Sequence, residues 1–378
     1  MSEVADVVVV GGGILGLFLA LELSRGSLRV IVLEAERFGS GATGNGFAWI
    51  NASSKMTNSD YHSLNASGLG HYRSLAAEFG EERIGWHGGG TLFIGDEEDG
   101  PSVVRLRDRM ETISAWNSPV CWLDSGEISA LEPNLALSKT SCALFATAEG
   151  WIEPGRLVRF LIEQGKEKGV EYREFSKVVG FRRDRLGNVS AALTKNDVIN
   201  TRQVALCAGV LNQEMLQLAF VIDESIPTPV FVSKSPGLIV EVNHLASNAQ
   251  IERVLYPSSV RGFHLRPTSA AGLALAADDT DEDRTESSVA ELIFRARKIL
   301  PAIPEGVAYT SRVCERPIPI DTYPLIGKLS HAQGFSLLAS HSGITLAPTL
   351  AHLLAQEIIS GEIQEKANPY RASRMFGN

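Results

Sequence analysis

Residues 6–36, DVVVVGGGILGLFLALELSRGSLRVIVLEAE, constrain the fold of this chain more than any other stretch. The valines of residues 7–10 lead into three consecutive glycines, which are followed by a helical pattern and a second apolar run. A strand, a glycine turn, a helix and a second strand form the βαβ unit that binds dinucleotides. The sequence therefore predicts an α/β fold with a nucleotide site at its first turn.

The glycines and the acid of this unit have separate roles. Gly11 permits a tight turn, Gly13 lets the backbone approach a pyrophosphate, and Gly16 lets the helix pack on the strand. The N–H groups and the positive dipole end at the helix start attract the anion. Glu34, 18 residues after Gly16, can accept hydrogen bonds from a ribose diol and disfavours a 2′-phosphate. The alternative is that these glycines serve only a tight turn.

Composition excludes several classes of partner. The chain has 378 residues and a net charge of −9, which argues against nucleic acid or an anionic membrane surface as the main partner. Its four cysteines lack metal-ligand spacing, so we expect free thiols and no metal site. The start, MSEVADVVVV, has no basic region or cleavage site, and no 18-residue apolar span occurs. We expect a cytoplasmic protein without an integral membrane span.

The rest of the pattern predicts a second lobe. A length of 378 residues suggests two domains or two intertwined lobes. Residues 230–279 alternate apolar and polar side chains, as an antiparallel sheet with one exposed face does. Residues 278–286, DDTDEDRTE, are expected to form a solvated acidic loop. Helices are predicted at 59–79, 103–116, 154–169, 288–300 and from the segment HSGITLAPTL to about 359, and strands at 90–94, 142–145, 170–175, 178–182, 189–194, 200–209, 237–242, 262–265 and 334–339.

Five motifs follow the first one, GGGILG at 11–16, along the chain: GSGATGNG at 39–46, WIEPGRLV at 151–158, LCAG at 206–209, RPIPIDTYPLIG at 316–327 and ASHSGITLAPTLAHLLA at 339–355. In these segments and in their order, the chain resembles the D-amino-acid oxidase superfamily of FAD-dependent oxidoreductases. That group includes glycine oxidases, sarcosine oxidases and D-amino-acid dehydrogenases. The segments span nearly the whole chain.

The resemblance implies an α/β fold in which a Rossmann-type FAD-binding domain is interleaved with an α+β substrate domain on a mixed sheet. The expected FAD-binding parts are 1–81, 146–215 and 315–378, and the expected substrate parts are 82–145 and 216–314. FAD would lie extended across the Rossmann lobe, with its flavin at the junction. The residues expected to contact it are Gly11, Gly13, Ile14, Gly16, Glu34, Ala35, Ser40, Thr43, Gly44, Asn45, Gly46, Ala208, Gly209, Cys314, Ser342, Gly343, Ile344 and Thr345.

The segment from Ser342 to Thr345 has a chemical reason to meet the flavin. Negative charge develops at the N1/C2=O side of a flavin that accepts a hydride, and a helix N-terminus stabilises such charge. Thr345 could also be an N-cap, with Pro348 in the first turn of the helix.

Four residues are candidates for the substrate site. In glycine oxidase-like members, the arginine matching Arg316 pairs with the substrate carboxylate, and its forked guanidinium suits that task. The alternative for Arg316 is a structural ion pair. Arg266 and His264 share one face of a predicted strand. His341 heads the flavin-edge loop, in contact with substrate or in a packing role.

Two departures from the family pattern qualify these expectations. A longer loop with an arginine, usual in glycine oxidase-like members, is replaced here by HSGI at 341–344. Cys314 matches in spacing the cysteine through which sarcosine oxidases attach FAD covalently. Covalent attachment needs a lowered thiol pKa, and ordinary packing is the alternative, so non-covalent FAD is the main expectation.

The resemblance implies that the enzyme oxidises the C–N bond of a small amino acid or N-substituted amino acid. Hydride would pass from the substrate carbon to flavin N5, and water would hydrolyse the imine. The electron acceptor is oxygen in an oxidase. The alternatives are a dehydrogenase that reduces a quinone or a partner protein, and a flavin-carrying subunit of a hetero-oligomeric amino acid or opine dehydrogenase. A homo-oligomer or a hetero-oligomer remains open.

Overall fold

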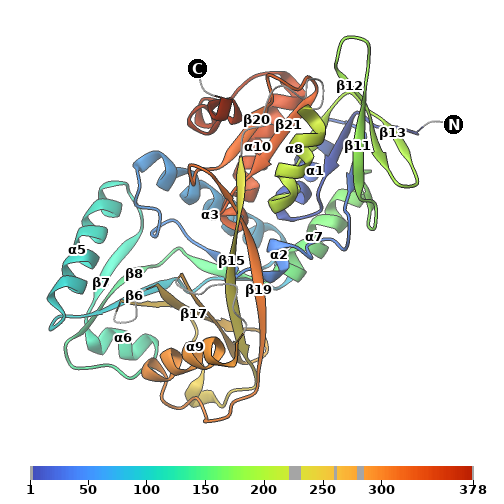
Figure 1. Cartoon of the computed structure of the whole chain (residues 1–378). Coiled ribbons are helices and arrows are strands. Elements are labelled where there is room, and N and C mark those ends of the chain that lie inside the picture. The colour runs from blue at the N-terminus through green and yellow to red at the C-terminus, as the bar shows by residue number, and fades with distance from the viewer. Residues whose placement is uncertain (1–2, 221–230, 259–261, 279–284, 377–378) are drawn as a thin grey trace.

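The computed structural model describes residues 3–220, 231–258, 262–278 and 285–376. Two large sheets organise the described chain, one in each of two lobes (Figure 1). The predicted fold class is confirmed, because a Rossmann-type sheet is combined with a mixed sheet from alternating parts of the chain.

The Rossmann-type sheet has six described strands, and five of them run parallel. Its order is β10 (Glu171–Arg173), β3 (Val30–Leu33), β2 (Val7–Val10), β14 (Val204–Leu206), β21 (Phe335–Ala339) and the antiparallel β20 (Leu325–Lys328). Segments from both ends of the chain thus lie side by side. The predicted return of residues 200–209 to this sheet is confirmed by β14, which pairs with β2 and β21.

The valines of β2 are buried on both faces, which explains their unbroken apolar run. On one face, Val7 and Val9 pack against α1 (Ile14–Ser24), α7 (Pro154–Glu167) and α10 (Gly343–Ser360), and α3 (Ser59–Phe79) packs on α10. On the other, Val8 and Val10 pack with α8 (Asn212–Phe220) and a smaller sheet. That sheet has the order β1 (Glu3–Val4), β13 (Val198–Asn200), β12 (Val189–Thr194) and β11 (Val178–Arg183).

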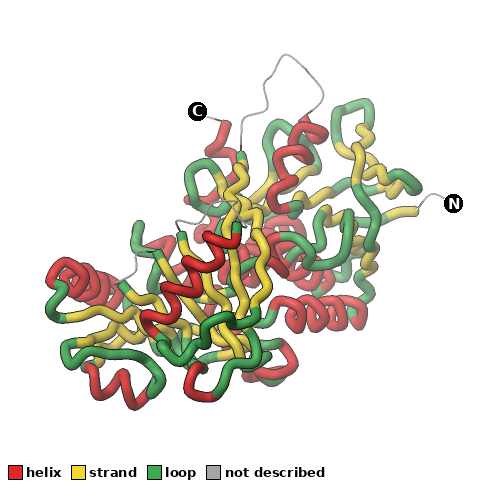
Figure 2. The backbone as a smooth tube through the Cα atoms, turned by 60° about the horizontal axis from the view of Figure 1, so that its bottom comes forward, coloured by secondary structure: helices red, strands yellow, loops and turns green. Residues whose placement is uncertain are grey.

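The second large sheet has eight described strands and is mixed, since β6 and β16 pair in parallel. Its order is β19 (Tyr309–Pro319), β15 (Val232–Val242), β18 (Gly272–Ala277), β17 (Phe263–Thr268), β16 (Val254–Pro257), β6 (Thr91–Asp96), β8 (Ser141–Ala146) and β7 (Val120–Leu123). The helix α9 (Glu286–Ile299) lies across one face of its strands (Figure 2). The other face of β6 and β8 is covered by α5 (Gly100–Ala115).

The long strands β15 and β19 join the lobes. They pair without interruption from Val232–Pro319 to Val242–Tyr309, and in Figure 1 they run from the large sheet up to the Rossmann lobe. The lobe boundaries given above stay our proposal, and the one at 314/315 falls within β19. A short sheet of β4 (Trp49–Ile50), β9 (Gly150–Ile152) and β5 (Trp86–His87), with α2 (Ala42–Asn45), α4 (Glu81–Ile84) and α6 (Ser125–Leu131), completes the main elements.

Helix boundaries follow local capping. The predicted helix 59–79 is confirmed by α3. The predicted start at 103 is wrong, because α5 already begins at Gly100 with Pro101 in its first turn. The predicted start at 288 is also wrong, since the Thr285 side chain caps α9, which begins at Glu286. Most of the predicted acidic loop 278–286 lies outside the described residues.

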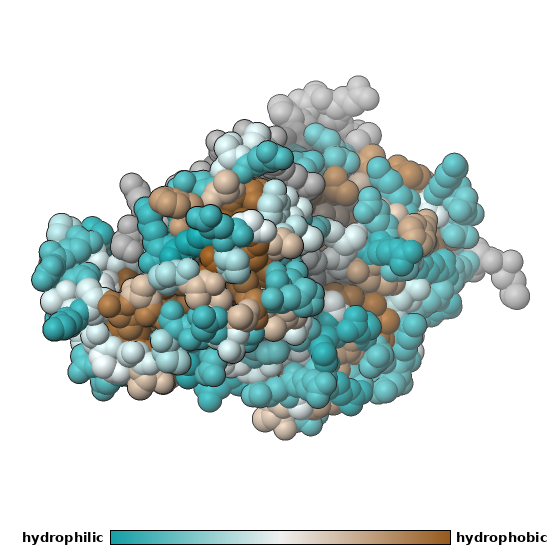
Figure 3. Space-filling view, turned by 90° about the horizontal axis from the view of Figure 1, so that it is seen from below, coloured by the Kyte–Doolittle hydropathy of each residue, from teal (hydrophilic) through white to brown (hydrophobic). Residues whose placement is uncertain are grey.

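The surface seen from below is mostly hydrophilic, with hydrophobic side chains in separate patches between polar ones (Figure 3). Among the described residues, no helix is long and apolar enough to cross a membrane.

Candidate active site

One cavity of about 740 Å³ runs along the junction of the lobes. Its walls include the carboxyl ends of β2, β3 and β14, the starts of α1 and α10, and one face of the large sheet at β15, β18 and β19. Ligands of open parallel sheets bind at this carboxyl edge. The volume falls within the usual range for cofactor and ligand sites.

The glycines of the first turn lie close to neighbouring backbone atoms, as predicted. Gly11 has a φ of +109°, and a side chain there would meet the Cys207 carbonyl oxygen at 2.5 Å. A side chain at Gly16 would meet the Gly11 carbonyl oxygen at 2.0 Å. Gly16 therefore serves helix packing and does not line the cavity, whereas Gly11 and Gly13 do.

Glu34 closes the nucleotide end of the cavity. One oxygen of its carboxylate accepts the Gly12 N–H at 2.7 Å, and the other accepts the Glu36 N–H at 2.9 Å. These bonds fix the carboxylate at the end of β3 and leave further lone pairs on each oxygen for a diol.

The loop after β3 is held by its own side chains. The Thr43 hydroxyl accepts the Ile14 N–H at 3.0 Å, at the first residue of α1. The Asn45 amide donates to the carbonyls of Ser40 and Gly41. Gly44 donates its N–H to the Gly39 carbonyl at 2.8 Å. Asn45 and Gly44 shape the loop and do not line the cavity.

The cavity brings together most residues predicted to contact the cofactor. Those lining it are Gly11, Gly13, Ile14, Glu34, Ala35, Ser40, Thr43, Gly46, Ala208, Gly209, Cys314, Ser342, Gly343, Ile344 and Thr345. The predicted residues outside its walls are Gly16, Gly44 and Asn45.

The start of α10 also lines the cavity. Ser342 occupies the N-cap position, so the alternative of Thr345 as N-cap is wrong. The Thr345 hydroxyl instead lies 3.4 Å from the Trp49 carbonyl oxygen. Pro348 lies in the second turn of the helix and not the first. By helix geometry, the N–H groups of Gly343, Ile344 and Thr345 have no acceptor within the helix.

Arg316 lies on β19 with its guanidinium across Gly237 of β15, where a side chain would meet Nη2 at 2.2 Å. Nη2 donates to the Pro236 carbonyl at 2.9 Å, and buried Nε has no hydrogen-bond partner. Among the described residues, no carboxylate lies within 4.0 Å of this side chain. The alternative role of Arg316, in a structural ion pair, therefore finds no partner among the described residues. Arg316 instead lines the cavity.

His264 and His341 also line the cavity. The His264 ring contacts Phe47 edge to face, with centroids 4.5 Å apart, and stacks on Tyr256 at 5.9 Å. Burial lowers the pKa of His264, and burial, with Lys55 and Arg316 nearby, lowers the pKa of His341 to about 4. Both rings are therefore neutral at neutral pH.

Arg266 has a structural environment and does not line the cavity. It lies on the same face of β17 as His264, since both contact Phe47, as strand alternation predicts. Its Nε donates to the Phe47 carbonyl at 2.5 Å, its Nη1 donates to the Pro267 carbonyl at 2.7 Å, and its guanidinium lies over Trp151. Burial lowers the pKa of Arg266 to about 10.

Cys314 faces the cavity from β19, and its Sγ lies 3.8 Å from the Ala42 carbonyl oxygen. Burial raises the pKa of this thiol, against a smaller opposite effect of Arg316 and Arg312. The four cysteines are free thiols, as predicted. The described residues contain no cluster of side chains that could hold a metal ion.

Sequence reasoning missed three cations of the cavity wall, Lys55, Arg109 and Lys177, and several of its other residues. Lys55 lies in the loop after β4, where no local pattern marks it. The inward position of Arg109 could have been predicted from helical periodicity. It lies three residues after Leu106 and four before Ile113, on the buried stripe of α5. Further missed wall residues are Trp49, Asn51, Tyr256 and Asp278.

The architecture fits FAD at both ends. Gly11 leaves a cradle that a side chain would fill, the start of α1 could offer N–H groups to a pyrophosphate, and Glu34 could accept hydrogen bonds from a diol. More than 300 residues later in the chain, the start of α10 lines the same cavity and could offer N–H groups to the flavin.

Comparison with known proteins agrees with this site. A family model described as "FAD dependent oxidoreductase" matches residues 6–357. The chain is 24% identical over 399 residues to glycine oxidase of Geobacillus kaustophilus (strain HTA426), covering 100% of this chain and 99% of the relative. A crystal structure of glycine oxidase from Geobacillus kaustophilus matches with a TM-score of 0.84, 23% identity and coverage of 99% of both chains.

Two further similarities are to a subunit of an oxidase and to a dehydrogenase. One of the subunits of an opine oxidase from Rhizobium meliloti is 23% identical, over 99% of this chain and 98% of the relative. The crystal structure of L-proline dehydrogenase from P. horikoshii has a TM-score of 0.85 and 20% identity, covering 100% of this chain and 99% of that one. Since the family model spans nearly the whole chain and the cavity fits its cofactor, the chain belongs to the FAD dependent oxidoreductase family.

Proposed function

We propose that the protein oxidises the C–N bond of a small amino acid or N-substituted amino acid with bound FAD, giving an imine that water hydrolyses. The observation that carries this proposal is Arg316. Its guanidinium lines the cavity near the start of α10 and has no carboxylate partner among the described residues. A half-buried guanidinium without a counterion is a ready site for a carboxylate.

Different residues would hold the cofactor and the substrate. The starts of α1 and α10, with Glu34, would hold FAD, which supplies the hydride acceptor when bound. Arg316 would fix the substrate carboxylate and so orient the C–H bond beside it. The N–H groups of Gly343 and Ile344 would stabilise negative charge at the flavin edge.

The neutral histidines bear on the protonation state of the substrate amine. With a pKa of about 4, His341 is a weak base, so it does not take a proton from a substrate ammonium at neutral pH. Lys55 and Arg316 also disfavour a further positive charge in the cavity. The amine would therefore react in its neutral form, without a side-chain base.

Arg316→Ala tests the proposal directly. We expect KM for the best amine substrate to rise about 10-fold to 150-fold, as the loss of a charged hydrogen bond of about 1.5–3 kcal/mol implies, while FAD stays bound. Gly237→Ala should have the same effect in milder form, because the added methyl group displaces the guanidinium. Lys234→Ala is the control, since this exposed cation on β15 pairs with Glu315. Unchanged kinetics in Arg316→Ala would remove Arg316 from the substrate site.

The electron acceptor is oxygen in our proposal. The similarity to one chain of an opine oxidase supports a second candidate, a flavin-carrying subunit that needs a partner chain, and the similarity to L-proline dehydrogenase supports transfer to another acceptor. Stopped-flow mixing of the reduced protein with air separates oxygen from other acceptors, because a dehydrogenase reoxidises slowly. If no amino acid bleaches the flavin anaerobically, the isolated chain is not a complete enzyme.

A further inference from the structure

His264 presents one ring nitrogen to the cavity in a defined chemical form. Its Nδ1 lies 3.0 Å from the Gly262 carbonyl oxygen, which also accepts the Asp278 N–H at 3.2 Å. A carbonyl oxygen only accepts hydrogen bonds, so Nδ1 carries the proton of the ring. Because burial keeps the ring neutral at neutral pH, it has no second N–H. Nε2 is therefore a bare acceptor.

Nε2 has no donor within the protein. Among the described residues, none donates a hydrogen bond to it. The ring lines the cavity, and Nε2 is not one of the fully buried atoms that lack a partner, so its lone pair is accessible from the cavity. Lys55 and Arg316 act on the ring electrostatically but form no hydrogen bond with it. Such an acceptor favours a ligand that brings its own N–H or O–H group.

The aromatic rings around His264 fix its orientation without using Nε2. Phe47 contacts the imidazole edge to face with centroids 4.5 Å apart, and Tyr256 stacks on it at 5.9 Å with an interplanar angle of 3°. Trp49 lies 6.1 Å away. The polar groups of these rings donate elsewhere, the Trp49 indole N–H to the Thr91 hydroxyl at 3.0 Å and the Tyr256 hydroxyl to a carboxylate at 3.5 Å. The lone pair of Nε2 therefore stays available, in surroundings that strengthen a hydrogen bond.

The register of the large sheet puts His264 and Arg316 on one face. His264 pairs with Ala276 of β18, which pairs with Ile239 of β15. Ile239 in turn pairs with Arg312 of β19. Directly paired residues share a face, and so do residues two or four apart along a strand. Arg316 lies four residues after Arg312 in an uninterrupted register, so its side chain emerges on the face of His264.

The spacing between these two side chains suits an α-amino acid. The Arg316 guanidinium lies across Gly237 of β15, and β15 is two strands away from β17, or about 10 Å. Gly237 and Ala276 line the cavity between them and are small, so the floor there is low. The nitrogen of an α-amino acid is two bonds from its carboxyl carbon. A carboxylate on Arg316 therefore allows the amine to reach Nε2.

We propose that Nε2 of His264 accepts a hydrogen bond from the substrate amine while Arg316 binds the carboxylate, so that the enzyme requires a substrate nitrogen that carries a hydrogen. This inference rests on the proposed function for the oxidation itself. No proton passes to His264, which only binds and orients the amine.

The hydrogen bond also orients the reacting nitrogen. A neutral secondary amine has one N–H and one lone pair. When the N–H points at His264, the lone pair is directed away from it and can assist the loss of hydride from the adjacent carbon. A neutral tertiary amine has no N–H, and it would leave Nε2 desolvated and unpaired. Primary and secondary amines are therefore the accepted class.

The binding test compares pyrrole-2-carboxylate with furan-2-carboxylate on the FAD-loaded protein by isothermal titration calorimetry. The two planar anions have similar size, and the pyrrole N–H does not titrate near neutral pH, whereas furan has an oxygen in its place. We expect pyrrole-2-carboxylate to bind at least about fivefold more tightly. His264→Phe keeps an aromatic ring but removes the acceptor, so the two anions should bind alike. His264→Gln keeps an acceptor oxygen and should retain part of the preference.

Two further variants separate this role from general effects of substitution. His87→Phe is the matched control, because His87 also stacks on an aromatic ring, that of Trp151 at 3.9 Å, but does not line the cavity. Its preference for the pyrrole should equal that of the wild type. Arg316→Ala should weaken both anions equally and leave the ratio unchanged. Flavin content and thermal unfolding verify that each variant is folded.

The turnover test compares the best amine substrate with its N-methylated tertiary derivative. We expect kcat/KM to be at least about tenfold higher for the amine that carries an N–H, and this advantage should shrink in His264→Phe. Equal binding of the two anions, binding of neither, or a preference that survives in folded His264→Phe would overturn the inference, as would equal turnover of the tertiary amine. If the pyrrole is preferred in a His264-dependent way but no amine is oxidised, the N–H site stands and the proposed oxidation fails.

Discussion

The Tyr72 hydroxyl donates a 2.7 Å hydrogen bond to the Ile344 carbonyl oxygen, in the first turn of α10. In an uninterrupted helix, this carbonyl would accept the N–H of residue 348, which is a proline and has none. Tyr72 is fully buried on α3, and burial raises the pKa of its hydroxyl well above the usual value, so it remains a donor. A side chain of one helix thus replaces a missing backbone bond of another.

The first prediction is a double-mutant cycle on this pair. Tyr72→Phe leaves the Ile344 carbonyl without a donor and should lower the free energy of unfolding by about 1–3 kcal/mol. Pro348→Ala restores the helical N–H, so Tyr72→Phe should cost clearly less in that background. Thermal and urea unfolding of the four proteins measure the coupling. Equal costs in both backgrounds would contradict a substitute role for Tyr72.

The second prediction uses two glycines of α3. A side chain at Gly68 would meet the Thr345 carbonyl oxygen at 2.1 Å, whereas one at Gly70 would meet nothing within 4 Å. Gly68→Ala should therefore displace the start of α10 and weaken FAD binding. Gly70→Ala should stabilise the protein by about 0.5–1 kcal/mol through helix propensity alone. Flavin titration and thermal unfolding of both variants give the comparison. Equal FAD affinity in the two variants would show that α10 tolerates the shift.

Features that depend on residues adjacent in sequence could be predicted, whereas contacts between distant residues could not. The turn at Gly11 and Gly13 follows from residues adjacent in sequence, so its strand, glycines and helix could be predicted. The same holds for the return of β14 to the sheet, because its apolar run is visible locally. The predicted start of α5 was late, because Pro101, which has no N–H to satisfy, is accommodated in the first turn of the helix.

The substrate end could be predicted only in part. Arg316 could be predicted from a motif, but the position of its guanidinium depends on the space left by Gly237 on the neighbouring strand. Arg266 and His264 lie on the same face of β17, as strand alternation predicts. The hydrogen bond from Arg266 to the Phe47 carbonyl nevertheless gives Arg266 a structural role. Lys55 is positioned by a loop whose shape depends on Glu149, which is distant in the sequence. Such long-range contacts leave no local pattern.

The third prediction concerns attachment of the cofactor. Because burial raises the pKa of Cys314, its thiol is a poor nucleophile at neutral pH. Acid precipitation of the holoprotein should release the yellow colour into the supernatant. Cys314→Ser should release the same fraction of flavin. Colour that stays in the wild-type pellet and leaves it in Cys314→Ser would instead establish a covalent bond.

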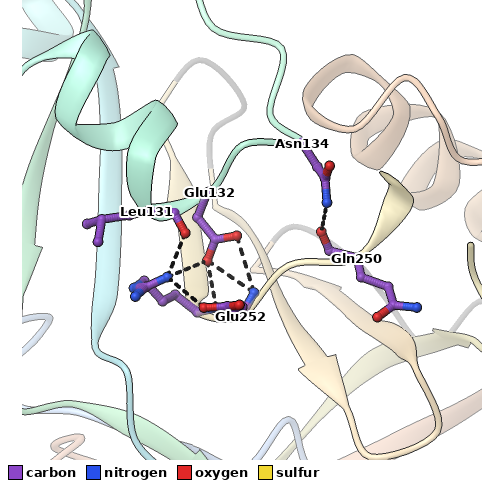
Figure 4. A network of polar contacts seen from close by, with 6 residues as sticks. Leu131, Glu132, Asn134, Gln250 and Glu252 are labelled. Carbon is purple, nitrogen blue, oxygen red and sulfur yellow. Dashed lines mark hydrogen bonds and ion pairs between the residues drawn. The ribbon is translucent and has the colours of Figure 1, made fainter. Parts of the chain in front are cut away.

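The fourth prediction concerns Glu132, a buried carboxylate that does not line the cavity and whose polar contacts are shown in Figure 4. Its oxygens accept the N–H groups of Glu252 and Arg253 at 2.8–3.2 Å, and the Arg253 guanidinium lies 3.4 Å away. Burial, opposed by these bonds, raises the pKa of Glu132 from 4.5 to about 7. The folded protein therefore binds a proton at this site that the unfolded chain has already lost.

The sign of the pH dependence follows from this difference. Between about pH 4.5 and about pH 7, the folded state binds more protons at Glu132 than the unfolded state, so the free energy of unfolding falls as pH rises. The loss is at most about 3 kcal/mol, from 1.36 kcal/mol per pKa unit. Glu132→Gln keeps an acceptor oxygen but does not titrate, so its stability should fall less over this range. Glu127→Gln is the control, because this exposed residue of α6 also loses a carboxylate and keeps its capping bond. Urea unfolding at pH 5, 6 and 7.5 measures the three slopes, and identical slopes in wild type and Glu132→Gln would show that the buried carboxyl does not hold its proton.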